Sequence, residues 1–448
     1  MANGQLDQLR AEVSAIQPSK WEGRAIDIGR GSIVVSGLAH VAALGDLVEI
    51  HSQSGPSQMG EILSLSGTDA VVLPDGAIEG LQLHDRVTLL GINEISPDSS
   101  WLGRIVDPYG KALDGRPLLR GLGSFPLRGA PKNAANRRSL GARLETGMRV
   151  FNTMLPIVRG QRLGLFAGSG VGKSTLMGKL ATGLDADVVV IAMIGERGRE
   201  LREFVERILG PAGMSRAVIV AATSDQSAVR RRRCAWAAMA VAEYFRDQGD
   251  HVLFFADSIT RFAEAHREVA LAVGEPGSLR GYPPSTASTI TELCERAGPG
   301  YDSPGDITAI FSILVAASDM EGPIADMLRG VLDGHVVLDR AIAERGRFPA
   351  IDLLRSVSRS LPDAATDSEN DIILQARKLL GVYEHHEMMV KAGLYTKGSD
   401  AEIDHAISAW SGLDAFIAQS EGLGGTTASF EALAECLAQQ IGAATPTT

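Results

Sequence analysis

The chain has 448 residues, a formal charge of −11, and 45% hydrophobic against 22% charged residues. This balance is typical of a soluble globular protein and excludes a wholly disordered chain. The length predicts two to four domains, and no apolar stretch approaches the roughly 20 residues that span a bilayer. The three cysteines form no CxxC pair, which favours a reducing compartment. The acidic charge argues against nucleic acid as the main partner.

The first 20 residues contain an apolar stripe at spacings of three and four. It consists of Leu6, Leu9, Val13 and Ile16 and predicts an amphipathic helix over 3–17, which Pro18 ends. Such a helix either packs on its own domain or detaches to bind a partner. We assign 1–20 to a partner-binding helix.

Residues 21–93 have the pattern of a small β-barrel. Short β-rich runs at 32–35, 47–50, 70–73 and 86–90 are separated by turn-forming residues. Residues 1–100 contain one aromatic side chain, Trp21, and 13 acidic against 5 basic residues. A barrel that binds oligonucleotides needs stacking aromatics and a basic groove. We therefore expect an assembly domain.

Residues 94–364 alternate strand-like and helix-like segments, which predicts an α/β domain with a parallel sheet covered on both faces. The predicted strands are 163–167, 188–194, 217–221, 252–256 and 308–315. Residues 365–448 predict a C-terminal helical domain. One helix carries an apolar stripe from Ile403 to Ile417 after a capping box of Ser399 and Glu402, and the last runs through Phe430, Leu433 and Leu437.

The clearest motif is LGLFAGSGVGKSTLMGKL at 163–180, where a strand enters a glycine-rich turn and then a helix. Backbone N–H groups of such a P-loop, together with the helix N-terminus, form a cradle for phosphate. Lys173 can reach the β- and γ-phosphates, Ser174 can bind Mg²⁺, and Thr175 is placed for the α-phosphate. The predicted ATP-binding residues here are Ala167, Gly168, Ser169, Gly170, Val171, Gly172, Lys173, Ser174 and Thr175.

Two further acidic residues follow predicted buried strands. Asp257 ends the run HVLFFAD and can hold the Mg²⁺, directly or through water. Glu196 and Arg197 end the run VVVIAMIGER, where open α/β sheets bind ligands. A carboxylate at that edge can orient and deprotonate an attacking water, although an acid at a helix start also occurs for structural reasons.

The segment RFPAIDLLRSVSRS at 347–360 contributes two candidates. Phe348 can stack on the adenine ring. Arg359 either supplies positive charge to the γ-phosphate across a subunit boundary or is a residue on the surface of a helix.

Together these strings resemble the type III protein-export ATPases, relatives of the rotary ATP synthase catalytic subunits, and most of all the flagellum-specific branch. The strings are FAGSGVGKST, MIGERGRE, EYFRDQGDHVLFFADSITRFAEAHREVALAVGEP, RGYPPS, ERAG and PIADMLRGVLDGHVVLDRAIAERGRFPAIDLLRSVSRS. The resemblance extends over residues 20–420. The loop GEPGS and the run STASTITEL depart from the family pattern, in a loop that the resemblance places at a central pore.

The resemblance implies a RecA-like core in a homo-hexamer that hydrolyses Mg-ATP at subunit interfaces to drive export of flagellar proteins. Lys173, Glu196, Arg197 and Arg359 would be catalytic, with Arg359 acting on a neighbour's site and Asp257 supporting the metal. It also implies a stator-like regulator at the N-terminal helix, a central stalk-like protein in the pore, and export chaperones with cargo at a membrane export gate. The protein would be cytoplasmic, associated peripherally with the inner membrane at the flagellar base.

Four alternatives stay open: a virulence injectisome ATPase, a rotary ATP synthase subunit, an RNA-translocating hexamer and a regulator that binds ATP without hydrolysis. The four consecutive arginines 230–233 are the best support for RNA, although such runs are usually solvated or interfacial. His385 and His386 are adjacent in a predicted helix, a poor metal clamp, and we interpret them as surface residues.

Overall fold

The computed structural model describes residues 13, 19–29, 31–53, 55–129, 136–301, 304–315, 322–418 and 424–438. Apart from Val13, the helix expected at 3–17 lies outside the described residues. The chain divides into two compact units, one of residues 1–137 and 187–307 and the other of residues 138–186 and 308–448. Each unit is described by itself.

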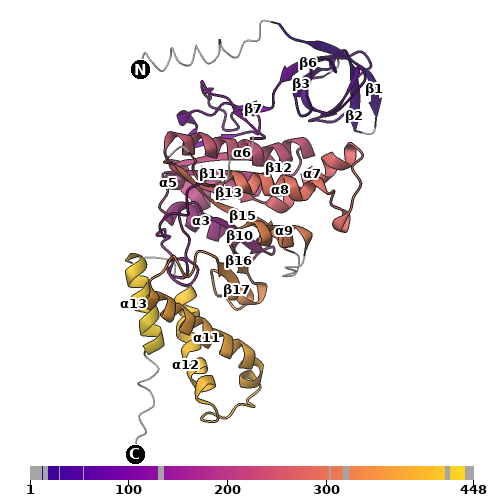
Figure 1. Ribbon diagram of the computed structural model, residues 1–448. Coiled ribbons are helices and arrows are strands. Elements are labelled where there is room, and N and C mark those ends of the chain that lie inside the picture. The colour runs from indigo at the N-terminus through magenta and orange to yellow at the C-terminus, as the bar shows by residue number, and fades with distance from the viewer. Residues whose placement is uncertain are drawn as a thin grey trace, which may run out of the picture. The chain divides into compact units, whose positions relative to one another are not determined.

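The first unit begins with a closed antiparallel barrel (Figure 1). Its strands are β1 (Glu22–Gly29), β2 (Ser32–Ser36), β3 (Leu47–His51), β4 (Gln58–Ser66), β5 (Asp69–Pro74) and β6 (Arg86–Gly91), in the order β1-β2-β5-β4-β3-β6. The four predicted strands are confirmed, whereas β1 and β4 were missed. Both strands place small residues in the core, so neither shows the run of large apolar residues by which a buried strand is predicted. At Gly60 of β4 a Cβ would lie 2.7 Å from Val72 Cγ1.

The same unit contains four parallel strands in the order β8-β12-β11-β13. They are β8 (Arg104–Val106), β12 (Ala217–Thr223), β11 (Val188–Glu196) and β13 (His251–Asp257). Helices α6 (Ala228–Gln248) and α7 (Ile259–Ala272) pack on this group of strands, and α8 (Ser285–Arg296) packs on both helices (Figure 1). Shorter elements are β7 (Glu94–Ile95), η1 (Ser99–Trp101), β9 (Phe125–Pro126), α4 (Gly198–Glu203), η3 (Phe204–Leu209), α5 (Gly210–Met214), η4 (Leu279–Gly281) and β14 (Gly298–Pro299).

The second unit holds the strand order β15-β10-β16-β17. Strands β15 (Asp306–Leu314), β10 (Arg162–Ala167) and β16 (Gly334–Leu338) are parallel, and β17 (Ile351–Ser358) is antiparallel to β16. The helices of this α/β part are α2 (Arg149–Asn152), α3 (Lys173–Gly183), α9 (Pro323–Val331) and α10 (Arg340–Glu344). The interpretation of Arg359 as a helix residue is therefore wrong, because β17 occupies the preceding residues. The apolar residues of β10 and β15 are buried apart from Leu314, as their largely hydrophobic runs predict.

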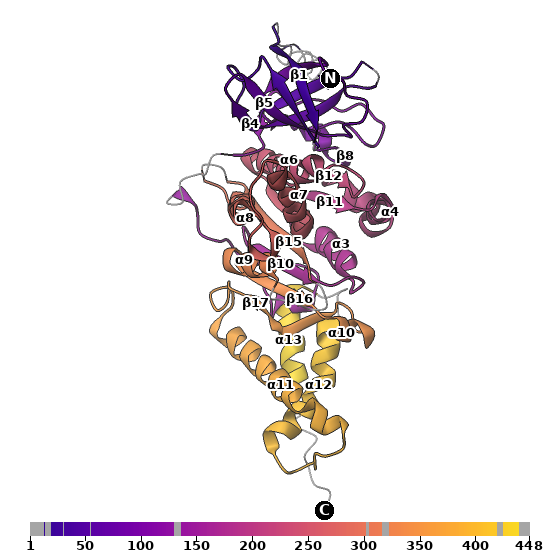
Figure 2. The same ribbon diagram turned by 90° about the vertical axis from the view of Figure 1, so that its right-hand side faces the viewer.

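Three helices complete the second unit: α11 (Asp367–Lys391), α12 (Ala401–Ala418) and α13 (Gly425–Ala438) (Figure 2). The predicted apolar stripes of α12 and α13 are confirmed as buried faces, with Leu413 and Leu433 fully enclosed. The predicted capping box at Ser399 is wrong. Asp400 directly precedes α12, and its side chain accepts hydrogen bonds from the N–H groups of Glu402 and Ile403.

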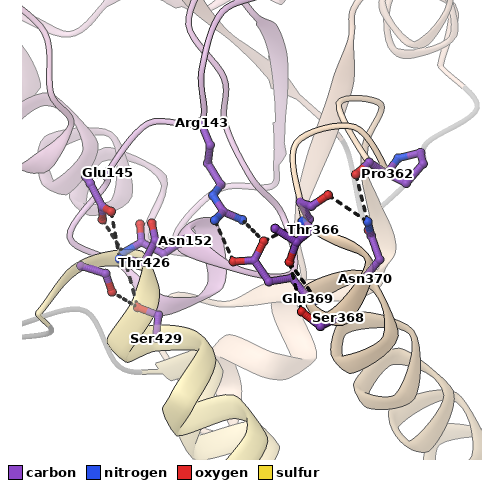
Figure 3. Close-up of polar contacts among 12 residues, drawn as sticks. Arg143, Glu145, Asn152, Pro362, Thr366, Ser368, Glu369, Asn370, Thr426 and Ser429 are labelled. Atoms are coloured by element: carbon purple, nitrogen blue, oxygen red, sulfur yellow. Dashed lines mark hydrogen bonds and ion pairs between the residues drawn. The ribbon is translucent and has the colours of Figure 1, made fainter.

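Polar side chains attach these helices to the rest of their unit (Figure 3). Arg143 donates two hydrogen bonds to Glu369, at 2.9 and 3.3 Å. Glu145 accepts from the N–H of Thr426 at 2.9 Å, next to a contact between Asn152 and Ser429. The expected architecture of a barrel, a largely parallel α/β core and C-terminal helices is thus confirmed. In the described residues, no helix has the length and apolarity to cross a membrane.

Candidate functional site

The predicted P-loop follows β10 and leads into α3. Gly170 and Gly172 have φ angles of 77° and 87°, a left-handed conformation that favours glycine and bends the chain tightly before the helix. Lys173 is the first residue of α3, and its side chain is half-buried with polar contacts of its own. Ser174 and Thr175 are exposed in the first turn of the helix. Backbone N–H groups at this helix start therefore have the arrangement that binds phosphate.

Phe348 lies against the P-loop. A Cβ at Gly172 would be 3.2 Å from Phe348 Cδ1, so the ring contacts the backbone of the loop. The side chain is 50% exposed, an unusual state for a phenylalanine that leaves part of the ring available to a ligand. The structure thus brings together two parts of the predicted site that are 176 residues apart in the chain.

Arg359 lies at the end of these strands that is opposite to the P-loop. In the register of β16 and β17, Ile351 pairs with Leu338 near the end of β10 that leads to the P-loop, whereas Ser358 pairs with Gly334. At about 3.3 Å per residue the ends of β17 are roughly 20 Å apart. Arg359 follows the far end, is exposed, and donates from Nη2 to the carbonyl oxygen of Arg329 at 2.9 Å. Its guanidinium is therefore remote from its own P-loop.

In the first unit, Glu196 is the last residue of β11 and is half-buried with polar contacts. The backbone N–H of Ser224 donates to the carbonyl oxygen of Glu196 at 3.0 Å, so the turn after the neighbouring strand β12 holds this residue in place. Arg197 follows at the start of α4. Its side chain is 76% exposed and forms an ion pair with Glu200 at 2.9 Å. An exposed pair of this kind is easily exchanged for a ligand.

Asp257 ends β13 and is 4% exposed, as predicted for an acid at the end of a buried strand. It has polar contacts within the structure. Ser258 follows and caps α7 by accepting from the N–H of Arg261. Both Glu196 and Asp257 therefore occupy the carboxyl ends of parallel strands, the edge at which α/β sheets bind ligands.

The four arginines 230–233 are engaged inside the first unit. Arg230 and Arg232 form ion pairs with Asp75 and Glu61 of the barrel, at 2.5 and 2.7 Å. Arg231 pairs with Glu268, and Arg233 donates to the carbonyl oxygens of Pro108 and Glu94. These side chains do not form the exposed basic face that RNA binding needs, which removes the main support for that alternative.

Sequence reasoning missed the segment between β12 and α6. Residues 223–227 read TSDQS, a polar run directly after a predicted buried strand, and that signal was available. Ser224 holds the backbone of Glu196, and Ser227 caps α6. His385 and His386 lie in α11 as expected, and the described residues contain no group of three potential metal ligands of the His, Cys, Asp or Glu type.

Two family models match the chain. The nucleotide-binding domain of the ATP synthase alpha/beta family matches residues 147–358, which include the P-loop, Glu196, Asp257 and Phe348. The C-terminal domain of the T3SS EscN ATPase matches residues 365–439. The chain is also similar to the assembled ATPase EscN of the enteropathogenic E. coli type III secretion system, with a TM-score of 0.85 and 35% identity over 93% of this chain and 100% of that one.

Curated relatives cover nearly the whole chain. A flagellum-specific ATP synthase of Caulobacter vibrioides is 42% identical over 420 residues, which are 92% of this chain and 95% of the relative. The protein of that name from Salmonella typhimurium is 39% identical over 92% of this chain and 93% of its own length. The chain therefore belongs to the family of the flagellum-specific ATP synthases.

Proposed function

We propose that this protein is an ATP hydrolase that drives type III export of flagellar proteins, working as a homo-hexamer. The P-loop holds the phosphates, with Lys173 on the β- and γ-phosphates and the backbone N–H groups of residues 167–175 around them. Phe348 contacts the adenine ring. The contact between Phe348 and the P-loop is the single observation that best supports nucleotide binding. The family relationship supports hydrolysis.

In this proposal Glu196 is the general base. Its carboxylate orients a water molecule and accepts the proton as the water attacks the γ-phosphorus, and the bond to the β–γ bridging oxygen breaks. Arg197 stabilises the negative charge that develops on the phosphate oxygens, for which its exposed pair with Glu200 can open. The hydrogen bond from Ser224 keeps the Glu196 backbone fixed during this step.

The residues present fit Mg²⁺. The Ser174 hydroxyl is exposed at the start of α3, and the Asp257 carboxylate lies at the end of β13. Oxygen ligands of these two kinds are those that Mg²⁺ takes in nucleotide sites, with Asp257 acting directly or through water. When bound with ATP, the ion neutralises charge on the phosphates.

We assign Arg359 to the site of a neighbouring subunit. Its position at the sheet edge opposite to its own P-loop supports this assignment, because a guanidinium there cannot serve its own γ-phosphate. Rotary synthases divide the glutamate base and the arginine between two kinds of subunit, whereas this chain carries both. Identical subunits in a closed ring can then form equivalent sites.

The domain plan of the proposal is a partner-binding helix at 1–20, an assembly barrel at 21–93, a RecA-like ATPase domain at 94–364 and a C-terminal helical domain at 365–448. The partners are a stator-like regulator, a stalk-like protein in the ring, and export chaperones with cargo at the export gate, on the cytoplasmic side of the inner membrane. A solved complex of EscN with its central stalk EscO supports the stalk.

The second candidate is export through a virulence secretion system, which the likeness to EscN favours. The 42% identity to a curated flagellar relative over 92% of this chain supports the flagellar apparatus instead. Restoration of motility in a flagellar export-ATPase deletion strain, against restoration of effector secretion in an injectisome strain, separates the two.

The test of the chemistry compares three variants of the full chain. Glu196→Gln should bind ATP with unchanged affinity and lose at least about 100-fold in kcat, as expected for loss of a general base. Lys173→Ala should weaken nucleotide binding. Glu206→Gln, an exposed residue paired with Arg202, is the matched control and should behave as wild type. Hydrolysis near the wild-type rate in Glu196→Gln would remove the assignment of the base.

A further inference from the structure

A carboxylate of the barrel is buried against the start of α6. Asp75 directly follows β5, and its side chain is only 1% exposed. One of its oxygens accepts from Ser227 Oγ at 2.7 Å, and the other accepts from Arg230 Nε at 2.5 Å. Both carboxylate oxygens are thus engaged by the first turn of a core helix.

Ser227 fixes two segments at once. Its Oγ donates to Asp75 and also accepts from the backbone N–H of Arg230 at 3.2 Å, which makes Ser227 the N-cap of α6. The position of this helix start therefore depends on the barrel carboxylate as well as on the helix itself. Loss of the carboxylate would leave the Ser227 hydroxyl without its acceptor in a partly buried place.

A short tight turn connects Ser227 to Glu196. The N–H of Gln226 donates to the carbonyl oxygen of Thr223 at 3.1 Å, and the N–H of Ser224 donates to that of Glu196 at 3.0 Å. Thr223 and Glu196 are register partners at an irregular point of the ladder between β11 and β12. Asp75 thus reaches the backbone of Glu196 through four consecutive residues, 224–227, and the two hydrogen bonds at their ends.

The residues of this turn, 223–227, are half-buried or exposed. An open cavity of about 450 Å³ borders it, lined by Asp75, Gln226, Ser227, Arg230, Arg231 and Glu268 among others. Because polar groups and solvent surround the turn, its hydrogen bonds rather than apolar packing determine its position. Burial raises the pKa of Asp75, and the hydrogen bonds from Ser227 and Arg230, with the positive charge of Arg230, act in the opposite direction.

We propose that Asp75 is a positioning residue for Glu196, acting through Ser227 and the hydrogen bond from Ser224. The contact of Asp75 with the start of α6 thereby influences the rate of ATP hydrolysis within a subunit, in addition to any part the barrel has in assembly. This inference rests on the proposed role of Glu196 as the general base.

The chain offers a matched control for this route. Glu61 of β4 also joins the barrel to α6, through Arg232 at 2.7 Å, with side-chain exposures of 5% and 4%. Arg232 lies within α6 and is not part of the turn at 223–227. Breaking this pair weakens the contact between the barrel and α6 but leaves intact the hydrogen bonds that lead from Asp75 to Glu196.

The experiment uses the full chain with Asp75→Asn, Ser227→Ala and Glu61→Gln, at protein concentrations where the rate per subunit has stopped rising. Asp75→Asn and Ser227→Ala should lower kcat about 10- to 100-fold, the scale of a displaced catalytic group, with KM and the affinity for an ATP analogue unchanged. Asp75→Glu should recover part of kcat. Glu61→Gln should lower the unfolding temperature and leave kcat within about twofold of wild type.

Two results would overturn the inference: kcat within twofold of wild type in folded Asp75→Asn and Ser227→Ala, or an equal loss of kcat in Glu61→Gln. Circular dichroism establishes folding, and if Asp75→Asn does not fold, Ser227→Ala decides alone. Measuring Glu196→Gln in the same experiment separates a failure of the positioning role of Asp75 from a failure of the general-base role of Glu196. Full activity in Glu196→Gln would overturn the proposed role of Glu196 as the general base, whereas an inactive Glu196→Gln with a normal Asp75→Asn would overturn only the positioning role.

Discussion

The barrel and the C-terminal helices are both attached through charged side chains, but at very different depths. The pair of Glu61 and Arg232 that anchors the barrel is about 5% exposed on each side. The pair of Arg143 and Glu369 that anchors α11 is 18% and 19% exposed, and Lys378 and Glu402 between α11 and α12 are more than half exposed. The Glu61–Arg232 pair of the barrel junction is therefore shielded from water, whereas the pairs at the helical junctions are partly solvated.

This difference has an energetic consequence. A buried ion pair is costly to open because each side chain is left with a charge that neither a partner nor water stabilises. A solvated pair exchanges its partner for water at little cost. We therefore expect the barrel junction to be rigid and the C-terminal junctions to be the more easily remodelled contacts, for example when another protein binds there.

The largest predicted effect is at the buried pair. Glu61→Gln should lower the free energy of unfolding by about 3–5 kcal/mol, because Arg232 keeps its charge without a partner. The double variant Glu61→Leu with Arg232→Met should recover most of that loss, since it removes both charges. Urea unfolding gives the free energy of unfolding of both variants, and hydrogen exchange reports separately on the barrel. A loss below about 1 kcal/mol in the single variant would show that the junction is more hydrated than its burial indicates.

A smaller effect depends on pH and involves His266 of α7. Burial, then the positive charges of Arg232 and Arg128, lower the pKa of His266 to about 4, while Glu275 and Glu61 act in the opposite direction. Its Nε2 contacts Ser285 Oγ at 2.8 Å. Because the folded protein holds this histidine neutral, its contribution to stability is complete above pH 6.5 and declines as pH falls toward 4.

His266→Gln should therefore flatten the fall in stability between pH 6.5 and 4, by at most about 3 kcal/mol at the acidic end. Unfolding temperatures of wild type and variant across this range provide the measurement. Ser408→Ala, at an exposed position of α12, is a neutral control. Parallel pH curves for wild type and His266→Gln would refute the buried, neutral state of the histidine.

The smallest effect is expected at the helical junction. Arg143→Ala should cost about 0.5–1 kcal/mol, since it removes a partly solvated pair and a cation–π contact with Phe430 at 5.2 Å. Hydrogen exchange of α11 and α13 should accelerate while the barrel remains unchanged. A cost equal to that of Glu61→Gln would erase the distinction between the two junctions.

The sequence predicted those parts of the fold that local patterns encode. Strands such as β11 and β13 are unbroken apolar runs, and the P-loop is contiguous, so both could be found without a structure. Strand β17 was harder because its buried side chains change phase between Leu353 and Ser356, where the pairing with β16 is irregular. That irregularity leaves Val357 exposed and breaks the alternation expected of a strand.

Long-range polar contacts were beyond the reach of sequence patterns. Asp75 and Ser227 are 152 residues apart, and Glu61 and Arg232 are 171 apart. Each of these residues is unremarkable in its own segment, and only the closed barrel against α6 gives them a partner. For the same reason the four arginines look like an exposed basic run in the sequence. In the fold, three of them pair with carboxylates and the fourth donates to backbone carbonyl oxygens.

The central claim is that one subunit binds ATP and its identical neighbour supplies Arg359. Full-length Arg359→Ala and Glu196→Gln chains, each inactive alone, should be mixed at equal concentration and their ATPase rate measured. Random assembly in a ring places an intact Glu196 next to an intact Arg359 at about one interface in four, so the mixture should reach roughly a quarter of the wild-type rate. No recovery at any mixing ratio, or full activity of Arg359→Ala alone, would contradict the account.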